Sequence, residues 1–286
     1  MVGEPWNDVS RELGRWADLG LRPRFWLRDD DACEMTPALA RLRDVAQQYD
    51  INIGLAVIPG KIQRSLLDAL AASTRMFYPM CHGWMHTDYG LPGKPEEFGS
   101  RRPFSALQSD ATLAYRTFSD HFGDSNVIFV PPYNRIAAQL VHALPDIGFA
   151  AVSVWPGFYE RTLLRLDSRL PWMPAVKMPQ RVVVPRLDVH VDVIDWKKGT
   201  ARDTIAVAAQ VVGQLRLRRR GFLPLEYPIG ILTHHLVHDE PIWALCDDLL
   251  QFLRAHDTVD FLAAGSLLEP APAQVAGRPL RRHPVK

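Results

Sequence analysis

The sequence RMFYPMCHGWMHTD, from Arg75 to Asp88, joins a predicted strand to a pair of histidines. Arg75 to Met80 is a short apolar run, which predicts a buried strand. The strand leads into His82, and His86 follows four residues later. Because positions i and i+4 share one face of a helical turn, the spacing predicts that both imidazoles converge on one cation. Taken alone, a buried structural histidine or a chance surface pair explains the spacing equally well.

Strands that end in polar residues recur along the chain. They are expected at residues 24–28, 75–80, 127–130, 189–194 and 229–232, followed by Asp29–Asp31, His82/His86, Tyr133/Asn134, Asp195/Trp196 and His234/His235. Helices are predicted between strands, at residues 37–48, 61–72, 105–122, 136–144, 204–219 and 242–255. Apolar strands alternating with helices predict a parallel sheet covered by helices, either doubly wound or a barrel. Polar clusters at the carboxyl ends of so many strands favour the barrel, whose active sites lie at that rim.

The composition excludes several classes of protein. Among 286 residues the formal net charge is +1, which argues against a general nucleic-acid or membrane-surface binder. The basic run 216–220 is interpreted as the solvated end of a helix. No segment approaches the roughly 20 apolar residues of a membrane span. The odd number of cysteines, and the lack of a signal-peptide pattern in residues 1–20, predict a cytoplasmic protein.

The polar clusters contain the groups needed for metal-dependent hydrolysis. A carboxylate and two imidazoles leave an open position on a catalytic zinc ion, where water becomes a nucleophile near neutral pH. A second carboxylate can take a proton from that water, and a separate histidine can protonate the leaving group. The sequence offers Asp29 and Asp30 side by side, the His82/His86 pair, and His234. The aspartates would also suit a simple helix N-cap.

The order of these motifs resembles that of the NodB-like polysaccharide deacetylases. Asp-Asp is followed by His-x-x-x-His, Pro-Pro-Tyr, Asp-x-x-Asp-Trp and Leu-x-His, over about Phe25 to Leu268. The resemblance implies a distorted (β/α)7 barrel, one divalent metal ion, with zinc expected, and hydrolysis of an acetyl group from a sugar. We expect a single catalytic domain over residues 1–269 and a disordered tail over 270–286.

The resemblance also implies roles for the residues of the first three motifs. Asp29 matches the general base, and Asp30 matches the carboxylate that binds the metal with His82 and His86. Tyr133 falls where a main-chain group contacts the oxyanion, with Pro131 and Pro132 shaping the groove. Asn134 is also expected to contact the substrate, because its amide lies near the expected metal, although it could simply end a turn.

The last two motifs supply the acid and the residues around it. Asp192 or Asp195 matches the carboxylate that orients the catalytic histidine, and we assign this role to Asp195. Trp196 matches the aromatic residue that lines the acyl pocket. His234 matches the general acid.

Three departures from the family pattern leave alternatives open. Asp31 stands where the family has glycine, so the base and ligand pair could shift by one residue. Val130 replaces the arginine that holds the base, and Arg28 or Arg135 could supply the missing charge.

The third departure is at the acid. His235 and His238 lie close to His234 in sequence, and either could act in its place. If the strand persists, His234 and His235 cannot both face the site, because successive residues point to opposite sides.

Together these features predict a metal-dependent hydrolase that removes an acyl group from an amino sugar or a related N-acyl compound. The expected partner is a carbohydrate or other small molecule, with no nucleic acid, and the sequence does not indicate an oligomeric state. Two alternatives are a hydrolase of another C–N bond in a small metabolite and a sugar-binding barrel without catalysis. Acetate release from N-acetylated sugars separates these possibilities.

Overall fold

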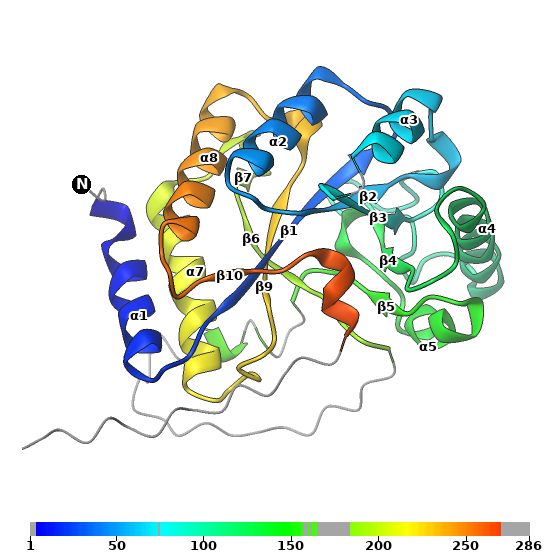
Figure 1. Cartoon of the computed structure of the whole chain (residues 1–286). Helices are drawn as coiled ribbons and strands as arrows, with labels where there is room; N and C mark the ends of the chain where they lie inside the picture. The colour runs from blue at the N-terminus through cyan, green and yellow to red at the C-terminus, as the bar shows by residue number, and fades with distance from the viewer. Residues whose placement is uncertain (1–3, 74, 157–159, 161, 165–183, 270–286) are drawn as a thin grey trace, which may run out of the picture.

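Parallel strands occupy the centre of the molecule, and helices surround them (Figure 1). The computed structural model describes residues 4–73, 75–156, 160, 162–164 and 184–269. The predictions for the tail at 270–286, and for most of the irregular stretch 156–185, therefore lie outside the described residues. Within them, no helix is long and apolar enough to cross a membrane.

Strands and helices alternate nearly as predicted. The main strands are β1 (Arg24–Ala32), β2 (Ile53–Val57), β3 (Phe77–His82), β4 (Ile128–Val130), β5 (Ala151–Val152), β6 (Val189–Asp192), β9 (Ile229–Thr233) and β10 (Asp260–Phe261). The helices are α1 (Asn7–Asp18), α2 (Pro37–Gln48), α3 (Arg64–Ala72), α4 (Phe104–Phe122), α5 (Ala138–Ile147), α7 (Thr204–Arg219) and α8 (Glu240–Arg254). A small hairpin follows β6, formed by β7 (Ile194–Asp195) and β8 (Thr200–Ala201). Short 3-10 turns are η1 (Glu4–Trp6), η2 (Pro59–Lys61), η3 (Pro132–Asn134), η4 (His235–Val237) and η5 (Ala264–Leu268).

The sheet curls into a barrel of parallel strands in the order β5-β4-β3-β2-β1-β9-β6. Its two edges meet, because the amides of Leu187 and Val189 donate to the carbonyls of Val152 and Val154, each at 3.0 Å. The closure is short, and β10 pairs with the first residues of β1. These irregularities make the barrel a distorted one, and the predicted (β/α)7 fold is confirmed.

The alternation of β1 decides which of its side chains enter the barrel. Phe25 and Leu27 belong to the large core between strands and helices, whereas Trp26 belongs to the core inside the barrel. Because successive strand residues point to opposite faces, Arg28 and Asp30 follow Trp26 to the inside. Asp29 follows its odd-numbered neighbours to the outside.

A buried polar cluster lies near the start of β6, away from the carboxyl rim. His190 is enclosed there, with its Nε2 atom 3.3 Å from the Arg218 guanidinium and 3.5 Å from the Glu160 carboxylate. Its Nδ1 atom accepts a hydrogen bond from the Gly230 amide at 3.0 Å, so this nitrogen carries no proton. Burial, together with the charges of Arg218 and Arg186, lowers the pKa of His190 well below its usual value. The position of this cluster, at the end of the barrel opposite the carboxyl rim, favours a structural role.

Candidate metal and catalytic centre

A distortion at the end of β1 brings two adjacent carboxylates to the same rim of the barrel. The pairing of β1 with β2 shifts register between Asp29 and Ala32, and Asp31 has a φ of 74°. Regular alternation would send Asp31 outward with Asp29. The irregularity turns its side chain toward the histidines instead, as β-bulges often do beside active sites.

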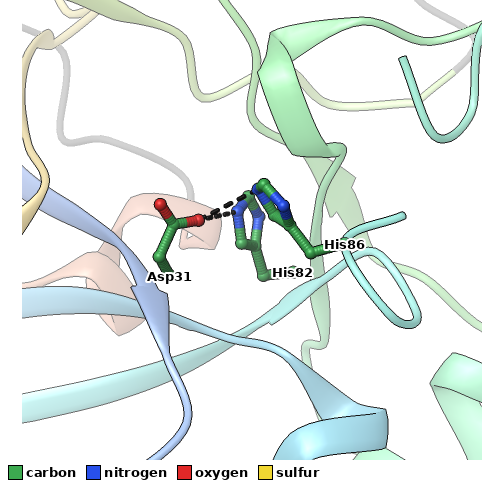
Figure 2. Close-up of side chains that lie close together, drawn as sticks. All are labelled: Asp31, His82 and His86. Carbon is green, nitrogen blue, oxygen red and sulfur yellow. Dashed lines mark hydrogen bonds and ion pairs between the residues drawn. The ribbon is translucent and has the colours of Figure 1, made fainter. Parts of the chain in front are cut away.

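Asp31, His82 and His86 form the cluster that could hold a metal ion (Figure 2). One carboxylate oxygen, Asp31 Oδ1, lies 3.0 Å from His82 Nε2 and 3.1 Å from His86 Nε2. Burial raises the pKa of the Asp31 carboxyl, but the hydrogen bonds from both imidazoles outweigh it and hold that pKa far below its usual range. The carboxylate beside the histidines is therefore that of Asp31, whereas the sequence analysis placed Asp30 there.

The His82 ring is oriented by a backbone carbonyl. Its Nδ1 atom lies 3.0 Å from the carbonyl oxygen of Val130 on β4, so in the neutral ring this contact places the proton on Nδ1. The Nε2 atom is then free to bind a cation. Histidines that bind metals are commonly oriented in this way, by a hydrogen bond from the other ring nitrogen to a carbonyl or carboxylate. His82 follows Met80 to the inside of the barrel, and Cys81 packs on the outer side in the core beside α4.

The two histidines converge without a helix. His82 is the last residue of β3, and no helix is assigned between it and the start of α4 in the structure. His86 adopts a φ of 54° in a turn after Gly83, whose φ is 57°. The predicted convergence is correct, but the predicted helical turn is wrong, because two left-handed residues fold the chain back in place of an i,i+4 repeat.

Asp30 faces the inside of the barrel, next to the cluster and opposite His234. Its Oδ2 atom lies 2.8 Å from the Arg28 guanidinium and 3.7 Å from His234 Nε2. Its Oδ1 atom is buried and accepts no hydrogen bond from the described residues. Asp30 therefore keeps one carboxylate oxygen that could accept a proton, since Arg28 uses only the other.

Arg28 supplies the positive charge beside the carboxylate that is missing because Val130 stands in place of the family's arginine. It is completely buried, and it donates to Asp30 Oδ2, to Asn134 Oδ1 at 2.7 Å and to Ser153 Oγ at 2.8 Å. The guanidinium comes from the strand that carries Asp30 itself, two residues earlier on the same face. Of the two arginines that the sequence left open, Arg28 is thus the one that holds the inner carboxylate.

Asp29 lies on the other face of β1 and does not reach the histidine cluster. Its carboxylate accepts from Thr233 Oγ1 at 2.8 Å and from the His235 amide at 3.0 Å, and it contacts His235 Nδ1 at 2.5 Å. Burial raises the pKa of Asp29, but the adjacent His235 outweighs it and the pKa lies below its usual value. The assignment of Asp29 as base thus disagrees with the geometry, because strand alternation buries this carboxylate beneath the helices.

His234 is the histidine that faces the site. It follows Leu232 to the inside of the barrel, whereas His235 turns outward to Asp29. Trp196 packs edge-on against its ring, with centroids 4.7 Å apart, and remains half exposed at 52%. His238 instead accepts from the His234 amide at 3.4 Å, and burial lowers the pKa of His238 to about 4.

Asp192, not Asp195, lies beside Trp196 and His234. Asp192 Oδ2 accepts from the Trp196 indole at 2.8 Å. Burial raises the pKa of the Asp192 carboxyl above its usual value, and the nearby His234 offsets only part of this rise. Asp195 sits on the β7–β8 hairpin, where its carboxylate accepts from the Lys197 amide at 3.1 Å and lies 3.6 Å from Lys198 Nζ. The assignment of Asp195 therefore disagrees with the geometry, because the chain turns between the two aspartates.

The Pro-Pro-Tyr segment packs against the turn that carries His86. Tyr133 and Asn134 both have positive φ, 61° and 54°, and the Tyr133 ring lies 4.6 Å from the His86 ring. Pro132 is buried against Gly83, where an added Cβ would come within 2.5 Å of it. The Asn134 amide oxygen accepts from Arg28, so Asn134, which was expected at the substrate, braces the arginine that holds Asp30.

The donor set fits a divalent cation with open positions. One carboxylate oxygen and two imidazole nitrogens lie within 4.8 Å of one another at the carboxyl rim, and one imidazole is fixed by a carbonyl. Nitrogen and oxygen donors of this kind suit zinc and similar ions, and three protein ligands leave room for water or substrate.

Comparisons with known proteins agree with this fold. The sequence matches no protein-family model and no curated protein. Among solved structures, a family 4 carbohydrate esterase from Streptomyces lividans, in complex with acetate, is 15% identical with a TM-score of 0.50, covering 84% of this chain and 91% of that chain. A mutant of a CE4 family pseudoenzyme is 14% identical with a TM-score of 0.51, covering 87% of this chain and 68% of that chain.

The chain therefore has the fold of the family 4 carbohydrate esterases, the NodB-like group that the motifs resembled. The fold is shared by an esterase and by a pseudoenzyme, so it does not decide whether this chain has activity. That question depends on the residues at the rim.

Proposed function

We propose that this protein is a metal-dependent hydrolase that removes an acetyl or related acyl group from an amino sugar. The observation that carries the proposal is the Asp31, His82 and His86 cluster, together with the adjacent Asp30 and His234, whose carboxylate and imidazole lie 3.7 Å apart. A base, an acid and a cation site are thereby collected at one rim of the barrel.

Asp31, His82 and His86 would hold the cation, with zinc as the expected ion. When bound, a divalent cation supplies Lewis acidity that polarises the acyl carbonyl and makes water more acidic. Three protein ligands would leave positions on the cation for water and for the substrate carbonyl.

Asp30 would take the proton from the attacking water through its unpaired Oδ1 atom. Arg28 fixes the other oxygen, so the free one keeps its direction. His234 would donate a proton to the leaving nitrogen, or to oxygen if the substrate is an ester. The Asp192–Trp196 hydrogen bond would hold the indole against His234 and shape the acyl pocket. Tyr133, through its main chain, would contact the developing oxyanion.

These assignments move the predicted base and ligand by one residue, to Asp30 and Asp31, and move the orienting carboxylate to Asp192. They keep His82, His86, His234 and Trp196 in their predicted roles. The substrate would be a carbohydrate or another small N-acyl compound.

The test combines cation content with product release. Purified protein is analysed for bound divalent metal and incubated with N-acetylglucosamine, its short oligomers and a nucleotide-linked N-acetyl sugar, with acetate as the measured product. We expect about one cation per chain, its loss in His82→Ala, and acetate release that His234→Ala abolishes. His121→Ala, at an exposed histidine on α4, serves as the matched control and should behave as wild type.

Two results would reject parts of the proposal. A protein that takes up no divalent cation even when one is supplied lacks the proposed centre. A protein that binds the cation but cleaves none of these compounds, nor any other C–N bond in a panel of small amides, is a binding barrel without catalysis.

A further inference from the structure

The turn that carries His86 is held by a buried carboxylate from further along the chain. Glu97 is 1% exposed, and its Oε1 atom accepts from the Met85 amide at 2.8 Å and the Thr87 amide at 3.3 Å. Its Oε2 atom accepts from the Trp84 amide at 3.2 Å. Three main-chain donors of an irregular turn thus converge on one anion, which replaces the partners that a helix would have given them.

The conformation of this turn requires such support. His86 has a φ of 54°, a left-handed conformation that is unfavourable for a residue with a side chain. Gly83 begins the turn with a φ of 57°, and a Cβ added there would clash with Glu97 Oε2. Glycine therefore meets two needs, the backbone angle and the space for the carboxylate.

Glu97 is itself fixed to the barrel. The next residue, Phe98, is fully buried, and its ring packs edge-on against Phe129 of β4 at 5.1 Å. The Phe98 carbonyl accepts from the Ala137 amide at 2.8 Å, and the Glu97 carbonyl accepts from Arg102 at 3.2 Å. The carboxylate is thereby tied to the same side of the barrel that orients His82.

We propose that Glu97 is a positioning residue, which holds the turn so that His86 is presented to the cation and the affinity for the cation is increased. The inference rests on the metal site of the proposed function. Hydrogen bonds to a carboxylate are about twice as strong as neutral ones, and a ligand fixed in advance loses less entropy on binding. An amide in its place would direct an N–H group at one of the main-chain donors, so Glu97→Gln removes the function while keeping the shape.

The experiment compares Glu97→Gln with Glu96→Gln. The neighbouring Glu96 carboxylate lies 3.7 Å from Arg101 and is not bonded to the amides of residues 84, 85 or 87, which makes it the matched control. Hydrogen exchange is measured for peptides covering residues 83–88 in metal-free protein. Affinities for Zn²⁺ and Co²⁺ are then measured by competition with a chelator.

For Glu97→Gln we expect exchange in the turn about tenfold faster, and cation affinity about 10- to 100-fold weaker, as is typical when a residue that orients a ligand is changed. The absorption spectrum of bound Co²⁺ should also change, whereas the control should match wild type. A purely structural role would lower the melting temperature of the metal-free protein and leave the affinity of the folded fraction unchanged.

Wild-type exchange or wild-type affinity in folded Glu97→Gln would overturn the inference. If the variant does not fold, Gly83→Ala, which displaces the same carboxylate oxygen, takes its place with the same expected result. If wild type binds no cation, the proposed function fails, and the exchange measurement still decides whether Glu97 holds the turn.

Discussion

Replacing Arg28 by methionine should expose how much the barrel depends on one buried guanidinium. Arg28 is fully buried and donates to three side chains, and its ion-pair partner Asp30 is only 2% exposed. Removing one member of a buried pair leaves the other charge unpaired in the interior. Such changes cost about 3–5 kcal/mol of the free energy of unfolding, and we expect Arg28→Met to fall in this range.

A double-mutant cycle measures the interaction between Arg28 and Asp30 apart from their contacts with other residues. Asp30→Asn alone leaves the guanidinium without its anion and should also destabilise the fold. Combined with Arg28→Met, it removes both charges, so the loss should be smaller than the sum of the two single losses by about 2–3 kcal/mol. Urea unfolding followed by tryptophan fluorescence measures these values, since the chain has 8 tryptophans.

An exposed pair provides the control for this cycle. Arg64 and Asp68 lie 2.8 Å apart on α3, with side chains 85% and 59% exposed. Arg64→Met should cost less than about 1 kcal/mol. If Arg28→Met is no more destabilising than Arg64→Met, or if the losses at Arg28 and Asp30 add to within about 0.5 kcal/mol, the argument that Arg28 replaces the missing arginine is wrong.

Three further predictions concern the surroundings of the site. Burial and the charge of Arg218 lower the pKa of His190 in the folded protein, so this histidine takes up its proton first in the unfolded chain as the pH falls below about 6.5. The free energy of unfolding should therefore fall by up to about 1.4 kcal/mol per pH unit between pH 6.5 and 5. The variant His190→Asn should flatten this part of the pH profile of stability. Asp29→Asn should lower the free energy of unfolding by about 3 kcal/mol yet keep the cation, as elemental analysis would show. Trp196→Ala should cost less than about 1 kcal/mol of stability, because the indole is half exposed, but should reduce kcat/KM for acetate release about tenfold. An unchanged pH dependence of stability in His190→Asn, unchanged stability in Asp29→Asn, or unchanged kcat/KM in Trp196→Ala would contradict these predictions.

Much of the fold could be predicted because its signals are local. The apolar run before His82 and the helix start at Thr36-Pro37 are short-range patterns, and the Thr36 hydroxyl does accept from the Leu39 amide at 3.0 Å. The order of polar clusters after strands predicted the rim on which the site is built. These features need no knowledge of distant contacts.

The register of the aspartates could not be predicted in the same way. Alternation alone places Arg28 and Asp30 on one face and Asp29 on the other, but the sequence does not say which face is inside. The positive φ of Asp31 depends on a bulge against β2, which is a property of the paired strands. A resemblance that places two carboxylates side by side therefore leaves a shift of one residue open.

Two residues on which the proposals depend, Glu97 and Asp192, were not assigned from the sequence for a related reason. Glu97 is 11 residues from His86 in a loop without periodicity, so nothing in the local pattern links its carboxylate to the turn. The only signals in the sequence are a glycine at position 83 and an acidic residue at position 97 of the same loop, and many loops contain such a pair. Asp192 was weighed but not chosen, since the turn between it and Asp195 decides which carboxylate faces the indole.

The most direct test of the account is the metal content of Asp30→Asn and Asp31→Asn, prepared side by side with wild type and analysed for divalent ions after supply of zinc. The account predicts that Asp31→Asn loses the cation, whereas Asp30→Asn keeps about one per chain and loses acetate release. Loss of the cation in Asp30→Asn with retention in Asp31→Asn would show that the carboxylate beside His82 and His86 is not the ligand, and would contradict the proposed centre.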